Sequence, residues 1–110
     1  MVLSRERLKK GSAQAIIANS GNANACTGED GLLNARQMTV EVAAALGCPV
    51  EQVLVASTGV IGVGLKMDKV VPGIRQAAAS LDRGQGGVMA RAIMTTDPFP
   101  KEQAVTVKTP

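Results

Sequence analysis

Short apolar runs alternate along this chain with segments that have the spacing of a helix. Residues 14–19 (QAIIAN) and 52–57 (QVLVAS) are apolar and rich in Ile and Val, a pattern that predicts two buried strands. We expect the first to stop at the turn residues 20–22 and the second at Thr58-Gly59. Residues 104–108 alternate as a strand does, and they predict a third strand.

The first predicted helix covers residues 31–46, where apolar side chains recur every three or four positions. Thr27 and Asp30 resemble a capping box at its start. Gly47, with a proline two residues further on, is typical of a helix stop. We therefore expect a single amphipathic helix between the first two strands.

Two further helices follow the second strand. Residues 68–81 predict one of them, with Pro72 tolerated in its first turn. Residues 88–94 predict a shorter one, after three glycines that we expect to interrupt the chain, at positions 84, 86 and 87.

The order strand, helix, strand, helix, helix, strand indicates an α/β or α+β layered structure, while the polarity of the sheet stays open. A chain of 110 residues has room for one domain. Hydrophobic residues make up 45% of it, but Phe99 is its single aromatic residue. Small aliphatic side chains bury less area than aromatic ones, so the expected core is thin and indicates a partner.

The net charge of +3 comes from scattered basic residues, apart from a run made of Arg5, Arg7, Lys9 and Lys10. We expect this run to be a solvated turn before the first strand. No aromatic residues are interleaved with it for base stacking, so we expect no nucleic-acid partner.

Metal and membrane sites are not indicated. The chain has no His, and Cys26 and Cys48 lack the spacing of metal ligands, which excludes most zinc sites and every His-based triad within it. It has no signal-like start and no run of about 18 apolar residues, so we expect a cytoplasmic protein.

Two segments after the predicted strands combine residue types that can carry chemistry. Residues 20–28 (SGNANACTG) can place backbone donors and Asn amides near a ligand, or can form an Asn-rich turn that bonds its own backbone. Ser57-Thr58-Gly59 offers a hydroxyl and an unshielded amide, which suit an oxyanion hole, although a strand-ending turn has the same composition.

Two other segments are weaker candidates. The spacing of Gly59, Gly62 and Gly64 fits neither a dinucleotide fingerprint nor a P-loop, so we do not expect phosphate binding. In residues 92–97, Thr95 or Thr96 can hold a substrate amide or carboxylate, and Asp97 can pair with an ammonium group or cap the turn.

Three motifs in this order and at these separations resemble the ornithine acetyltransferase family: SGNANACTG, VLVASTGVIG at residues 53–62, and AIMTTDPFPK at residues 92–101. The similarity runs from about Val2 to about Val107. It implies an α/β (α+β) layered sandwich of the ornithine acetyltransferase / DmpA-like type. Residues 1–110 are then a single partial domain, part of the α chain of a self-cleaving precursor.

The resemblance also implies roles for individual residues. Thr58 and Gly59 match the oxyanion hole of the family, and Thr95 matches a substrate contact. The nucleophile of the family is the new N-terminal Thr of the β chain, and neither Thr95 nor Thr96 matches it. We therefore expect the 110 residues to be inactive on their own.

The implied reaction belongs to arginine biosynthesis and moves an acetyl group from N-acetylornithine to glutamate. It needs no metal or organic cofactor, although some family members also accept acetyl-CoA. The implied partner is the β chain, in an assembly of two α and two β chains. The alternatives are a paralogous acyltransferase or aminopeptidase of the same superfamily, and a non-catalytic fragment that serves as a binding module.

Overall fold

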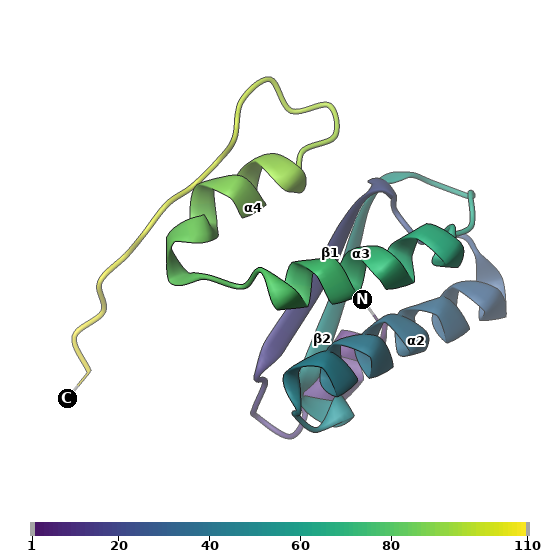
Figure 1. The fold of residues 1–110 in the computed structure, drawn as a ribbon, viewed down its shortest axis with the longest axis horizontal. Coiled ribbons are helices and arrows are strands. Elements are labelled where there is room, and N and C mark those ends of the chain that lie inside the picture. The colour runs from purple at the N-terminus through teal and green to yellow at the C-terminus, as the bar shows by residue number, and fades with distance from the viewer. Residues whose placement is uncertain (1, 110) are drawn as a thin grey trace.

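A computed structural model describes residues 2–109 and has two parallel strands at its centre (Figure 1). β1 (Ala15–Asn22) pairs with β2 (Val53–Val60). The helix α2 (Gly28–Leu46) makes the crossover that a parallel pair requires. The predicted α/β class is confirmed, and the sheet, whose polarity the sequence left open, is parallel.

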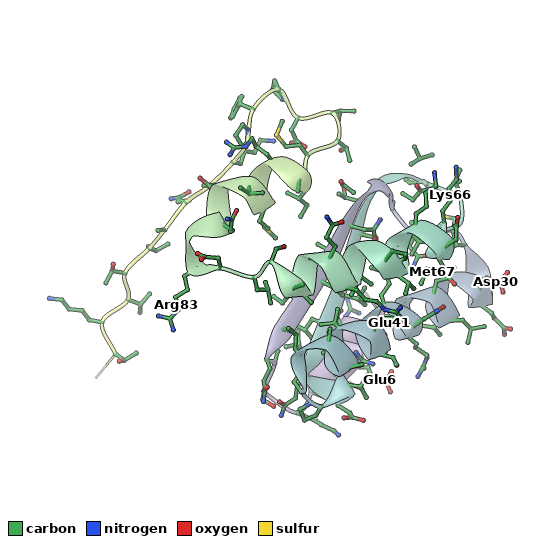
Figure 2. The ribbon with its side chains drawn as sticks, in the orientation of Figure 1. Glu6, Asp30, Glu41, Lys66, Met67 and Arg83 are labelled. Atoms are coloured by element: carbon green, nitrogen blue, oxygen red, sulfur yellow. The ribbon has the colours of Figure 1, made fainter. Side chains whose placement is uncertain are left out.

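The remaining elements surround this β-α-β unit. They are the helices α1 (Val2–Leu8), α3 (Met67–Ala79) and α4 (Gly86–Ala92), and the 3-10 turns η1 (Val50–Gln52) and η2 (Arg83–Gln85). The helix α3 packs along α2, and Glu41 of α2 points towards α3 and binds Arg75 at 2.9 Å (Figure 2). This ion pair is exposed on the arginine side, so it contributes about 0–1 kcal/mol.

The core lies between α2 and one face of the sheet. Met38 on α2 and Val53 on β2 are fully buried, and Val55 is nearly so. The cluster is aliphatic, as the composition predicts, and consists of Leu3, Ala35, Met38, Val42, Ala43, Val53, Val55, Leu65 and Ile74. Burying a side chain of this size contributes about 1.5–3 kcal/mol.

The helix α1 contradicts the prediction of a solvated turn over the basic run. The Ser4 hydroxyl donates to the Val55 carbonyl at 2.7 Å and accepts from the Val55 N–H at 2.9 Å. Arg7 donates to the Val53 carbonyl at 2.5 Å. Burial lowers the pKa of the Arg7 guanidinium. The helix thus covers the outer edge of β2, and only Lys9 and Lys10 lie in a turn.

The helix predicted over residues 31–46 is confirmed, but its start differs. It begins at Gly28, and the Thr27 hydroxyl donates to Asn24 Oδ1 and accepts no N–H of the helix, so the predicted capping box with Asp30 is wrong. The predicted stop is confirmed. Gly47 has a φ of 66° and its N–H bonds to the Ala43 carbonyl, the left-handed ending that glycine favours.

The two later helices are confirmed with shifted bounds. Because α3 begins at Met67, Pro72 lies in its second turn rather than its first, and the Asp68 carbonyl loses its intrahelical partner. The helix α4 begins at Gly86, so two of the three glycines expected to interrupt the chain start a helix instead.

The prediction of a third strand over residues 104–108 is wrong. After a loop that follows α4, residues 101–109 run as an extended tail (Figure 1), and Val105 and Val107 are 83% and 78% exposed. Alternating apolar residues form a strand only where a neighbouring strand satisfies their backbone groups, and within residues 2–109 none lies beside them. A search of the same residues finds no helix long and apolar enough to cross a membrane.

We predict that Ser4→Ala destabilises the protein by about 1–3 kcal/mol, because both the N–H and the carbonyl of Val55 lose their buried partner. The melting temperature of the complete polypeptide measures this effect. Ser80→Ala is the matched control, since the Ser80 hydroxyl is exposed and bonds only within its own helix end. Equal melting temperatures for the two variants would show that the edge of β2 does not need Ser4.

Candidate functional site

Two segments that the sequence singles out, residues 20–28 and 57–59, meet at the carboxyl ends of the two strands. Because β1 and β2 are parallel, Ser20 pairs with Thr58 and Gly21 with Gly59. Ligands of open α/β sheets bind outside this edge. Both strands run three residues further than predicted, so Thr58 and Gly59 lie within β2 rather than in a turn after it.

The two glycines explain why the strands continue. Gly21 and Gly59 have φ values of 105° and 129°, which side-chain-bearing residues rarely adopt. A Cβ atom on Gly59 would lie 2.3 Å from the carbonyl carbon of Gly21. The Gly21–Asn22 peptide therefore packs directly on Gly59, and no residue other than glycine fits there.

Thr58 projects from the face of the sheet that is opposite the core. Side chains alternate along a strand, so Thr58 shares a face with Leu54 and Ala56, while Val53 and Val55 face α2. Thr58 is half-buried, and among residues 2–109 its hydroxyl has no hydrogen-bond partner. Its donor is available to a ligand beside the backbone of Gly59.

The Asn side chains of residues 20–28 form hydrogen bonds with nearby backbone carbonyl groups. The Asn24 amide donates to the Gly31 carbonyl at 2.8 Å, and the Asn22 amide lies 3.4 and 3.3 Å from the carbonyl oxygens of Val63 and Gly64. Asn24 also takes a left-handed φ of 50°. Residues 20–22 belong to β1 rather than to a turn, and the Asn amides bond backbone carbonyls of neighbouring segments rather than their own, so the predicted self-bonded turn is found only in part. The Asn22 amide thereby contacts the loop that follows β2.

Thr95 follows α4 in an exposed turn. Its N–H donates to Asp97 Oδ2 at 3.4 Å, so Asp97 has the turn-capping role. The hydrogen bond from Lys101 is the main cause that lowers the pKa of Asp97 below its usual 3.8, and the Thr95 N–H adds to it. Among residues 2–109 no hydrogen bond joins Thr95 to Thr58 or Gly59.

One contact that the sequence did not indicate links the two parts of the candidate site. The Ser20 hydroxyl donates to the Ala92 carbonyl at 2.6 Å, across 72 positions of the chain. Ala92 is the last residue of α4 and lies three residues before Thr95. No local signal in the sequence pairs a strand serine with a distant helix end.

The ArgJ family model matches residues 1–109 of this chain. The chain is 58% identical over 108 residues to the arginine biosynthesis bifunctional protein ArgJ of Caldanaerobacter subterraneus subsp. tengcongensis, covering 98% of this chain and 26% of that protein. It is 49% identical over 105 residues to a glutamate N-acetyltransferase of Methanothermobacter thermautotrophicus, covering 94% and 26%. The chain thus spans about a quarter of the length of these relatives.

Two solved structures share the fold. The ornithine acetyltransferase of Mycobacterium tuberculosis, in complex with ornithine, matches with a TM-score of 0.87 and 38% identity, covering 89% of this chain and 54% of that one. The arginine biosynthesis bifunctional protein of Bacillus halodurans matches with a TM-score of 0.81 and 40% identity, covering 89% and 52%.

We predict opposite effects for two glycine-to-alanine variants of the complete polypeptide. Gly59→Ala should lower the melting temperature strongly, because the methyl group meets the backbone of Gly21 at a positive φ. Gly73→Ala should raise stability by about 0.5–1 kcal/mol, because Gly73 lies inside α3 with open space around it. If thermal unfolding of Gly59→Ala matches the unmodified protein, the close contact of the strands is not made.

Proposed function

Since the chain belongs to the ArgJ family, we propose that it supplies the oxyanion hole of an acetyltransferase that moves an acetyl group from N-acetylornithine to glutamate. The family is one of arginine biosynthesis, and the relatives include a glutamate N-acetyltransferase and an ornithine acetyltransferase. The complete protein is proposed to have the layered α/β sandwich of this family.

The observation that carries the proposal is the geometry at the end of β2. The Thr58 hydroxyl has no partner among residues 2–109, and the neighbouring Gly59 presents its backbone without a side chain at a φ of 129°. A hydroxyl and an amide N–H on adjacent residues can both donate to one oxygen atom. Such paired donors stabilise negative charge that develops on a carbonyl oxygen.

The proposed reaction has two half-reactions. The hydroxyl oxygen of the β-chain Thr attacks the acetyl carbonyl of N-acetylornithine, and its own amino group takes the proton. The tetrahedral oxyanion lies between the donors of Thr58 and Gly59. The C–N bond then breaks, ornithine leaves with the proton on its amine, and an acetyl-enzyme ester remains. The amine of glutamate attacks this ester through a second oxyanion, which the same donors hold. The ester C–O bond then breaks, N-acetylglutamate leaves, and the proton of the glutamate amine passes by way of the Thr amino group to the Thr oxygen.

Thr95 is proposed to contact the substrate, and residues 1–110 are proposed to be one partial domain of the α chain of a self-cleaving precursor. The proposed partner is the β chain, in an α2β2 assembly. The aliphatic core and the open face of the sheet, where Ile16 is 69% exposed, support a partner that covers this face.

We predict that Thr58→Ala in the complete polypeptide lowers kcat by about 10²–10³ with a smaller change in KM, because one donor to the oxyanion is lost. Steady-state acetyl transfer to glutamate measures both constants. Thr58→Ser keeps the hydroxyl and should retain most of the activity. An unchanged kcat in Thr58→Ala would remove Thr58 from the oxyanion hole.

A further inference from the structure

The helix α4 is connected to the sheet through Ser20. Figure 1 shows α4 separated from α2 by the strands, so it lies on the side away from the main core. Across this side the Ser20 hydroxyl of β1 donates to the Ala92 carbonyl at 2.6 Å. The last carbonyl groups of a helix lack intrahelical partners, and Ser20 supplies one to the last residue of α4.

Ser20 is also the neighbour of the proposed oxyanion hole. Its Cα partner across the parallel pair is Thr58, and parallel strands lie about 4.8 Å apart. Paired residues point to the same face, so the side chains of Ser20 and Thr58 leave the sheet together. The hydrogen bond to Ala92 therefore starts beside the group that is proposed to hold the oxyanion.

The chain between this bond and Thr95 is short and held by backbone hydrogen bonds. Thr95 is the third residue after Ala92, which limits the distance between their Cα atoms to about 11 Å even when the chain is fully extended. The Met94 N–H bonds to the Arg91 carbonyl, which continues the turn of the helix, and the Thr95 N–H bonds to Asp97. The position of Ala92 therefore limits where Thr95 can lie relative to Thr58.

We propose that Ser20 is a positioning residue that holds the substrate contact Thr95 at its working distance from the oxyanion pair, an inference that rests on the proposed function. Ser20 does not act as a substrate donor, because a hydroxyl has one proton and Ala92 accepts it. It acts by fixing the end of α4 to β1. Misplacing a substrate-binding group by about 1 Å is enough to weaken a productive complex.

The test is a set of variants of the complete polypeptide. Ser20→Ala should raise the KM for N-acetylornithine by about 5- to 10-fold, the usual effect of losing one hydrogen bond, with a smaller change in kcat. Ser20→Thr retains the hydroxyl and should restore KM to within about 2-fold of the unmodified enzyme. Ser12→Ala is the control, since Ser12 is exposed and has no hydrogen-bond partner among residues 2–109.

A double-mutant cycle with Thr95→Ala separates positioning from a general effect on folding. If Ser20 acts through Thr95, Thr95→Ala alone raises KM, and adding Ser20→Ala changes it by less than about 2-fold more. If the two substitutions raise KM by factors that multiply, the inference is overturned. It is also overturned if the KM of Ser20→Thr is as high as that of Ser20→Ala.

The cycle also separates failure of this inference from failure of the proposed function. An unchanged KM in Ser20→Ala, beside a raised KM in Thr95→Ala, overturns the role of Ser20 alone. An unchanged KM in Thr95→Ala removes the proposed substrate contact and the inference with it. Absence of acetyl transfer by the unmodified complete polypeptide contradicts the proposed function itself.

Discussion

Where Gly59 passes Gly21, the two backbones lie closer than residues with side chains would permit, and the site is built around this contact. A Cβ on Gly59 would lie 2.3 Å from Gly21. The contact lets both strands continue to Asn22 and Val60, and it fixes the register that puts Ser20 beside Thr58. Thr58, a proposed donor, and Ser20, which binds the end of α4, are therefore neighbours. Their pairing precedes that of the two glycines by one residue.

The packing around the strands leaves one face of the sheet partly exposed. The helix α2 covers the face with Val53 and Val55, and α1 covers the outer edge of β2 through Ser4. The face with Thr58 meets α4 through the Ser20 bond, while Ile16 on the same face is exposed. Because the chain spans about a quarter of the length of its relatives, a thin aliphatic core and an open face agree with a piece of a larger structure.

Features that depend on local spacing and turn residues can be predicted from the sequence. Features that depend on contacts between residues far apart in the chain cannot. The helix ending at Gly47 follows from side-chain periodicity and a left-handed stop. Thr58-Gly59 was predicted to end a strand because glycine usually interrupts one, but Gly21 on the partner strand accommodates it. The N-terminal helix and the Ser20–Ala92 bond depend on partners 46–72 positions away, which no local pattern encodes. The proposed roles of Thr58, Gly59 and Thr95 are suggested by their residue types and assigned by the family resemblance.

Whether the protein is a self-cleaving acetyltransferase is tested by measuring acetyl transfer from N-acetylornithine to glutamate by the complete polypeptide, with the masses of its chains determined in the same preparation. We expect transfer together with two chains, produced by self-cleavage before the proposed nucleophilic Thr. Cleavage without transfer to glutamate would leave the fold assignment intact and would indicate that the substrate is that of a paralogue. If the polypeptide is not cleaved and transfers no acetyl group, the proposed function is wrong and a non-catalytic module is favoured.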